Sequence, residues 1–283
     1  MKSMLKLTSL TAALVMGGMF ATSANAFSLY SSSLLEDDNR ERLSVDLNGN
    51  GLLDKGDTLR GTLEILKITN LNPPFQTQLP LVPELTGIFE IEVTNKTFFA
   101  PGVFVYTFGP NAAFGASVAA PGAMVAFYTG GTNLDLTTCA SVAACETAAT
   151  DGAQWLVAGF AEADDEWVTG GPAPENTNLL GIPQATKVGF YNYALSILVN
   201  NTGRKLLEQS LPCLPGVLFT CAGDGKTGLV CSGDILGGLG VANGYTSTSD
   251  FDFQLSVPEP GSVALMGLGL LGLGFSARRR KAK

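Results

Sequence analysis

The chain has 283 residues; 46% are hydrophobic, 15% are charged and 34 residues are glycine, a composition that favours a turn-rich, all-β extracellular protein over a helical cytosolic enzyme. Residues 27–257 carry ten basic and 24 acidic side chains, a net charge of −14, which excludes a nucleic-acid partner because it repels the phosphate backbone. The chain contains no histidine, which excludes a Ser–His–Asp triad, a Cys–His dyad and every histidine-ligated metal site.

Residues 1–26 have the three parts of a secretory signal peptide. Lys2 and Lys6 are basic, residues 7–21 are apolar or small, and residues 24–26 form an Ala-Asn-Ala cleavage site. The apolar stretch is shorter than the ~20 residues of a membrane-spanning helix, so cleavage is favoured over a permanent N-terminal anchor. We therefore expect export and a mature chain that begins at Phe27.

The strongest internal motif, residues 46–57, matches an EF-hand-type calcium loop. Gly51 falls at position 6, where the loop turns sharply. The oxygen donors at positions 1, 3, 5, 7, 9 and 12 would be Asp46, Asn48, Asn50, the carbonyl of Leu52, Asp54 and Asp57.

This motif resembles the calcium loop of dockerin repeats, which also carry Asp at position 12, and loops that precede strands in bacterial surface modules. The chain has one copy, so a complete two-copy dockerin module is not expected. Asp57 is one methylene shorter than the usual Glu, which predicts a modest affinity. The alternative is an Asx-rich hairpin turn without metal.

Alternation of apolar and polar residues predicts strands that bury one face. It is clearest at residues 89–93, 191–199 and 251–257. Further strand candidates are residues 58–68, 102–108, 122–129 and 153–162, and a short helix is considered near 140–150. Many short strands separated by Gly/Pro turns predict a β-sandwich or jelly-roll-like domain over residues 27–257.

All five cysteines lie in the exported part of the chain, where an oxidising compartment favours disulfides. Cys139 and Cys145 would close a small loop and are the first candidate pair. Two of Cys213, Cys221 and Cys231 could form a second bridge. The odd number leaves one thiol over, or one that pairs between chains.

An acidic cluster precedes the second of the two tryptophans, Trp155 and Trp167; it consists of Glu162, Asp164, Asp165 and Glu166. A glycosidase needs two carboxylates facing each other across a sugar, whereas neighbouring carboxylates on one loop more often form a solvated turn. The tryptophans could stack on sugar rings if exposed, but a core role is favoured.

Residues 258–283 form a three-part tail. Pro258, Glu259 and Pro260 come first, residues 262–277 are apolar and glycine-rich, and the basic cluster Arg278, Arg279, Arg280 and Lys281 follows. The tail resembles the PEP-CTERM sorting signal of Gram-negative bacteria. That resemblance implies a short transmembrane sorting helix and processing near Pro-Glu-Pro by an exosortase, a membrane-embedded cysteine transpeptidase. The alternative is a plain tail anchor.

These features predict an exported, surface-sorted, non-enzymatic structural or adhesive protein that is stabilised by calcium. Its expected partners are the exosortase and the inner membrane during sorting. The domain would face the periplasm and then reach the outer surface or the extracellular matrix. The resemblance implies a setting in exopolysaccharide, biofilm or floc. The alternatives are a carbohydrate-binding module that uses Trp155 or Trp167, and a secreted carboxylate-dependent glycoside hydrolase.

Overall fold

The computed structural model describes residues 29–100, 103–172, 189–210, 226–237 and 243–258. The predicted signal peptide and nearly all of the sorting tail lie outside these ranges. The elements within them are β1 (Ser32–Val45), β2 (Thr58–Asn70), β3 (Thr77–Gln78), β4 (Leu85–Ala100), β5 (Val103–Pro110), α2 (Ala112–Ser117), β6 (Ala123–Thr129), α3 (Val142–Thr150), β7 (Ala153–Gly159), β8 (Glu166–Pro172), β9 (Gly189–Asn200), β10 (Gln209–Ser210), β11 (Lys226–Thr227), β12 (Leu229–Gly237) and β13 (Ser247–Ser256).

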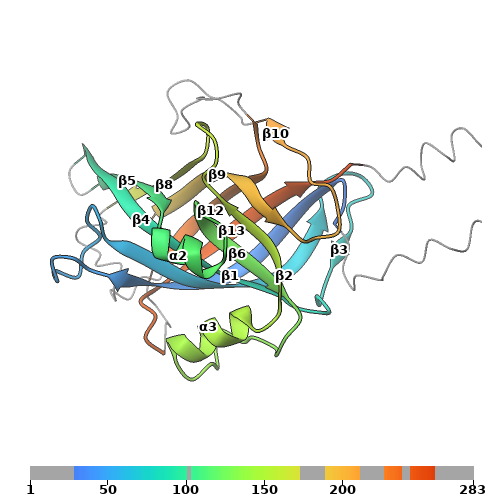
Figure 1. Cartoon of the computed structure of the whole chain (residues 1–283), viewed down its shortest axis with the longest axis horizontal. Coiled ribbons are helices and arrows are strands. Elements are labelled where there is room, and N and C mark those ends of the chain that lie inside the picture. Colours follow the sequence, from blue (N-terminus) through green and yellow to red (C-terminus); the bar gives the residue numbers. More distant parts are fainter. Residues whose placement is uncertain (1–28, 101–102, 173–188, 211–225, 238–242, 259–283) are drawn as a thin grey trace, which may run out of the picture.

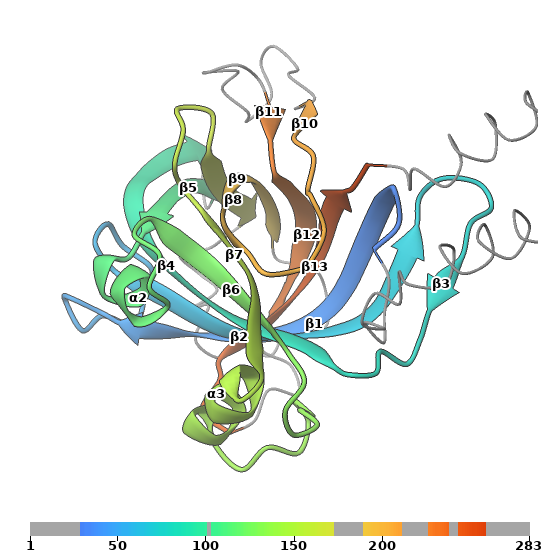
Figure 2. The same ribbon diagram turned by 45° about the vertical axis from the view of Figure 1, so that its right-hand side comes forward.

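Eleven of these strands form one antiparallel sheet in the order β3-β2-β1-β13-β12-β9-β7-β6-β4-β5-β8, and β10 pairs with β11. Two further pairings, β2 with β4 and β8 with β9, close the sheet on itself. Figures 1 and 2 show the strands wrapped around a common interior.

The closed sheet forks at two of its long strands, β4 and β9. Residues 85–89 of β4 pair with β6, and residues 91–100 pair with β5. Residues 190–194 of β9 pair with β8, and residues 196–200 pair with β7. The all-β prediction is confirmed, and the two layers expected of a sandwich are parts of one continuous sheet.

The main core fills the interior of this sheet with aromatic side chains. The predicted alternation holds in β4 and β13, since Phe89, Phe251 and Phe253 are buried while Glu90 and Asp250 face outward. Trp167 of β8 stacks on Tyr193 of β9, with ring centroids 4.1 Å apart. Residues that alternate with period two therefore bury one face of strands such as β1 and β13.

A second apolar cluster lies outside the sheet, where α2 and α3 cover β4, β6 and β7. Ile88, Ala126 and Val157 project from the strands and meet Phe114 of α2 and Ala149 of α3. The helix considered near 140–150 is present as α3. Its N-cap is Ser141, whose hydroxyl accepts the Ala144 N–H.

Candidate functional site

The predicted calcium loop connects β1 to β2 at one end of the domain. Its backbone turns at Gly49 and Gly51, which have φ values of 68° and 73° and so take a conformation that favours glycine. Leu53 is buried in the main core. The loop is therefore attached to the domain by an apolar side chain while its polar side chains stay near the surface.

The side chains at positions 1, 3 and 5 of the loop organise its backbone. The Asp46 carboxylate accepts the Gly49 and Gly51 N–H groups, both at 2.7 Å. The Asn48 side-chain oxygen accepts the Asn50 N–H at 3.0 Å. The Asn50 side-chain oxygen accepts the Leu52 N–H at 2.6 Å. The two asparagine bonds are Asx turns, and the two Asp46 bonds reach further along the loop. A metal-free turn can make all four.

Asp54, at position 9, is where several side chains of the loop converge. One of its oxygens accepts from the amides of Asn48 and Asn50, at 2.9 and 2.8 Å. The other accepts from the Lys96 ammonium of β4 at 2.8 Å, and this charged donor is the main reason that the pKa of Asp54 falls to about 2. Positions 3, 5 and 9 are thus brought to one point, where a lysine supplies positive charge.

Asp57, at position 12, connects two parts of the loop backbone. Its side chain is fully buried, and its oxygens accept the N–H groups of Leu47 at 2.9 Å and Asp54 at 2.7 Å. In the described ranges no group of three or more acidic or cysteine side chains is close enough together to hold a metal ion. Asp57 therefore fastens the loop, and the side-chain amides of Asn48 and Asn50 lie against the carboxylate of Asp54.

Both tryptophans belong to the core. Trp155 and Trp167 are 5% and 1% exposed, so neither presents a ring to a sugar. The carbohydrate-binding alternative loses the stacking surface on which it was based.

The acidic cluster before Trp167 builds a turn. Asp165 accepts the N–H groups of Ala161 and Glu162 at 2.6 and 2.7 Å. Asp164 is buried and accepts the Lys226 N–H at 3.2 Å.

A surface pocket of about 320 Å³ lies beside this turn, between β9 and β11. Two carboxylates, Glu162 and Glu208, line it together with Ser196, Asn200 and Lys226. No aromatic side chain is among its described lining residues. Asp164 and Asp165, the carboxylates considered for catalysis, do not line it.

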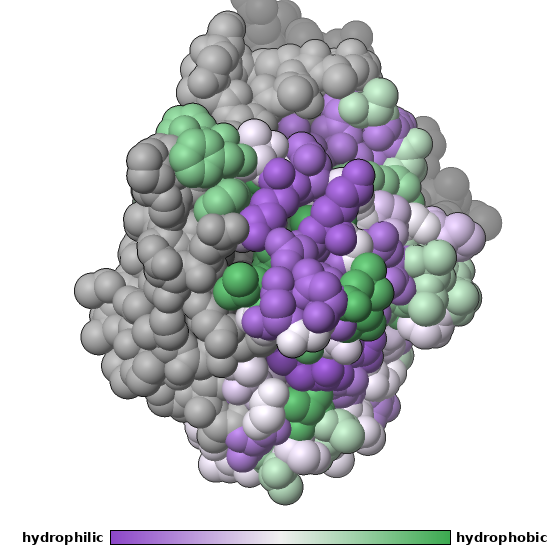
Figure 3. Space-filling model, turned by 90° about the vertical axis from the view of Figure 1, so that its left-hand side faces the viewer, coloured by the Kyte–Doolittle hydropathy of each residue, from purple (hydrophilic) through white to green (hydrophobic). Residues whose placement is uncertain are grey.

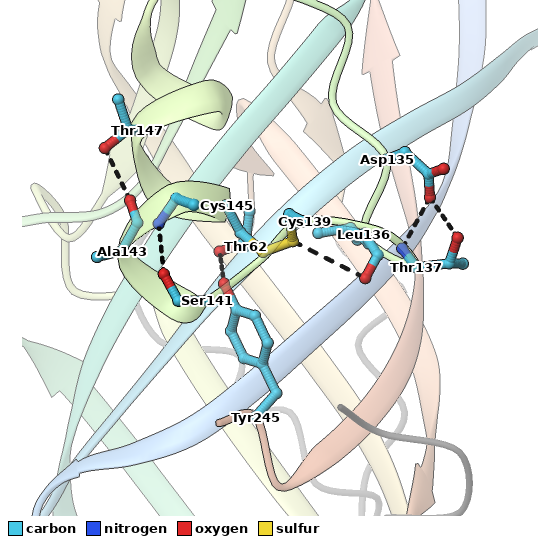
Figure 4. The surroundings of a disulfide bond; sticks show 11 residues. Thr62, Asp135, Leu136, Thr137, Cys139, Ser141, Ala143, Cys145, Thr147 and Tyr245 are labelled. Atoms are coloured by element: carbon cyan, nitrogen blue, oxygen red, sulfur yellow. Dashed lines mark hydrogen bonds between the residues drawn. A yellow bond between two sulfur atoms is a disulfide. The ribbon is translucent and has the colours of Figure 1, made fainter. Parts of the chain in front are cut away.

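Cys139 and Cys145 form a disulfide, with Cα atoms 5.5 Å apart. Cys139 precedes α3, and Cys145 lies in its first half. Figure 4 shows this bridge beside Tyr245, whose hydroxyl lies 2.5 Å from that of Thr62 on β2. Cys231 is buried and takes no part in this bridge. Cys213 and Cys221 lie outside the described residues.

Sequence reasoning missed a row of buried polar residues on β1. The ladder between β1 and β13 is interrupted between Glu36 and Asn39. There Asp37 accepts the Phe251 N–H at 2.8 Å, and Asn39 accepts the Ser249 N–H at 3.1 Å. Burial raises the pKa of Asp37 well above its ordinary value. These side chains replace backbone hydrogen bonds that the strands do not make there.

The polypeptide leaves the described domain at Pro258, two residues after β13 ends. Residues 256–281 match the family model described as the PEP-CTERM protein-sorting motif. The chain carries an exosortase sorting signal. PEP-CTERM proteins are exported and sorted by way of the membrane, so the predicted export is supported. Comparison with curated proteins and with solved structures gave no match.

The PEP-CTERM motif includes all of the predicted sorting residues, from Pro258 to Lys281. Glu259, Pro260 and the basic residues at 278–281 lie outside the described part of the structure, as does the predicted signal peptide. Within the described ranges, no helix has both the length and the apolar composition of a membrane span. The predicted sorting helix, residues 262–277, falls outside those ranges.

Proposed function

We propose that this PEP-CTERM protein is a non-enzymatic structural or adhesive component of the bacterial surface matrix, delivered there by exosortase processing. One observation carries the proposal. The sorting motif begins at Ser256, the last residue of β13, so the signal is joined directly to the closed sheet. A folded domain held by its last strand would be released at the surface in one piece when the tail is cut.

The test is intact-mass analysis of protein recovered from the surface of cells with and without a functional exosortase. With the enzyme, we expect a chain that begins at Phe27 and has lost the residues after about Pro260. The Glu259→Ala variant should keep its tail and accumulate in the membrane fraction. Full-length tails in matrix material from cells that contain the enzyme would contradict the proposal.

We propose that exopolysaccharide is the material to which the domain adheres. The pocket that Glu162 and Glu208 line is the described surface that favours a saccharide-binding alternative, because clefts with converging polar groups suit such ligands. A glycan array separates the two. Broad, weak binding unchanged in Glu162→Gln and Glu208→Gln variants supports a matrix component, whereas selective binding that both variants abolish supports a lectin-like module.

We further propose that the loop of residues 46–57 binds calcium. The side-chain amides of Asn48 and Asn50 lie against the Asp54 carboxylate through their N–H groups. Rotation of both amides would turn their oxygens toward a cation at that point, which supports the proposal because calcium prefers several hard oxygens on a tight loop. Asp46 and the carbonyl of Leu52 would complete the donor set, and Asp57 would hold the loop in shape. The Lys96 ammonium must leave Asp54 when a divalent cation arrives, which predicts weak binding.

Lys96 makes the calcium proposal testable with a matched pair of variants. Lys96→Met removes the competing ammonium and should tighten calcium binding. Lys55→Met removes an exposed charge from the same loop without touching the ion pair and should change the affinity much less. Isothermal titration of calcium into the wild type and both variants measures this difference. Equal affinities for the two variants, or no binding in any of the three proteins, would contradict it.

A further inference from the structure

Residues 71–83 form the connection between β2 and β4 up to its last residue, Glu84, and this uncharged loop exposes large apolar side chains. No Asp, Glu, Lys or Arg occurs among its 13 residues, although residues 27–257 carry a net charge of −14. Leu79 and Val82 are 66% and 64% exposed, and Phe75 is 73% exposed. Apolar side chains gathered on one neutral loop are typical of a contact surface.

This loop lies at the end of the domain from which the sorting signal leaves. The Leu71 N–H donates to the Ser32 carbonyl at 2.9 Å, and the Asn72 side chain donates to the Ser31 hydroxyl at 3.1 Å. The Val257 N–H donates to the Ser31 carbonyl at 3.2 Å. Figures 1 and 2 show β3, which is part of this loop, on the same side as both ends of the described chain.

The base of the loop is held firmly. The Asn70 N–H donates to the Gln76 carbonyl at 2.7 Å, and the Asn70 side chain donates to the Pro74 carbonyl at 3.2 Å. β3 adds a short pairing of Thr77 and Gln78 with β2. The exposed apolar residues are therefore presented by a structured loop whose position relative to the exit point is set by the sheet.

The sorting tail limits how far this end of the domain can be from a membrane. Only three residues separate Pro258 from Ser262, where the apolar segment begins. Fully extended, the connection from Pro258 to Ser262 spans at most about 14 Å. The headgroup layer on one side of a bilayer is itself about 5–8 Å thick. With the tail in the membrane, the exit end of the domain must therefore lie at or near the headgroups.

We propose that the loop of residues 71–83 rests in the headgroup layer of the membrane while the tail is anchored there. This inference depends on the proposed sorting through the membrane and adds a second contact with the same bilayer. A neutral loop approaches anionic lipids without the repulsion that the acidic remainder of the domain meets. Two contacts restrict the tilt of the domain and hold the Pro-Glu-Pro segment at the membrane surface, where a membrane-embedded transpeptidase works.

The opposite end of the domain supplies a matched control. Phe99, near the tip of the β4–β5 hairpin, is 75% exposed, close to the 73% of Phe75 in the loop. Figure 3 views the domain from that opposite end, where hydrophilic residues gather across the middle of the face with apolar ones beside them. Exposure alone therefore does not distinguish Phe75 from Phe99, whereas distance from the exit point does.

The experiment uses the full chain in vesicles of phosphatidylethanolamine and phosphatidylglycerol, with part of the lipid brominated on the acyl chain. Phe75→Trp and Leu79→Trp place a fluorophore on the loop, and Phe99→Trp places one at the far end. The native Trp155 and Trp167 are buried and give a constant background. We expect brominated lipid to quench the two loop tryptophans and to leave Phe99→Trp at the wild-type level.

Vesicle flotation, measured on the same samples, distinguishes failure of the loop contact from failure of sorting through the membrane. Chains that float while the loop tryptophans remain unquenched would overturn the loop contact and leave the sorting function intact. Equal quenching at Phe75 and Phe99 would also overturn it, because the contact would not be specific to the exit end. Chains that do not float would overturn sorting through the membrane and the loop contact together.

Discussion

Replacing Glu64 by glutamine should stabilise the protein at neutral pH and leave its stability unchanged in acid. Glu64 projects from β2, opposite Asp38 on β1 and Thr86 on β4. Burial raises the pKa of the Glu64 carboxyl from 4.5 to about 7. Repulsion from Asp135 adds to this rise, and a hydrogen bond from the Leu136 backbone opposes it. The folded protein therefore holds a proton that the unfolded chain releases.

The pH range of this effect follows from those two pKa values. Below pH 4.5 the carboxyl is protonated in both states, so it makes no pH-dependent contribution. As the pH rises from 4.5 to about 7, the unfolded chain loses its proton first and the free energy of unfolding falls. A difference of about 2.5 pKa units corresponds to about 3.4 kcal/mol at full burial. Glu64 is only partly buried, so solvent screening reduces this to about 1.5 kcal/mol.

Thermal melts of the wild type and of Glu64→Gln at pH 4 and pH 8 test the reasoning. The variant should melt about 3–6 °C higher than the wild type at pH 8, and the two should melt together at pH 4. In Asp135→Asn the repulsion is gone, so the loss of stability should still begin near pH 4.5 but should end at lower pH and be smaller. A Glu64→Gln shift of equal size at both pH values would refute the assignment, because it would come from packing rather than from titration.

Three further predictions concern the core, the cysteines and the calcium loop. Trp167→Ala should lower the free energy of unfolding by about 3–5 kcal/mol, measured by urea denaturation, since Trp167 packs against Phe89, Tyr193 and Phe251; a loss below about 1 kcal/mol would place the ring outside the core. Unreduced protein in denaturant should have three or fewer free thiols, and five would contradict the bridge between Cys139 and Cys145. A hundredfold excess of calcium over Kd should raise the melting temperature by about 5–10 °C, and the effect should be absent in Asp46→Ala.

Local alternation predicted most of the strands because it reports which face of each strand is buried. Phe89 and Phe251 lie inward as expected, and β2 and β6 lie where strands were predicted. β1 was missed because Asp37, Asn39 and Glu41 occupy inward positions and make the segment look solvated. Their burial becomes intelligible only with β13 in place, since Asp37 and Asn39 accept hydrogen bonds from its backbone.

Closure of the sheet was not predictable from local patterns. β4 pairs with β2, β5 and β6, and nothing in its own sequence specifies three partners. In the candidate site, the spacing of Asp46, Asn48 and Asn50 predicted the turn, because Asx side chains act within a few residues. The contact between Lys96 and Asp54 spans 42 residues and required the tertiary fold.

The forked, closed sheet also limits the ways in which copies of this protein can associate at high concentration. Each of the ten described strands of seven residues or more has hydrogen-bonded neighbours on both sides over at least part of its length. The described strands paired on one side alone are two residues long. An amyloid fibril grows when the next chain pairs with a long, unpaired edge strand. A matrix filled with this domain would therefore gain cohesion through side-chain contacts and resist conversion into amyloid.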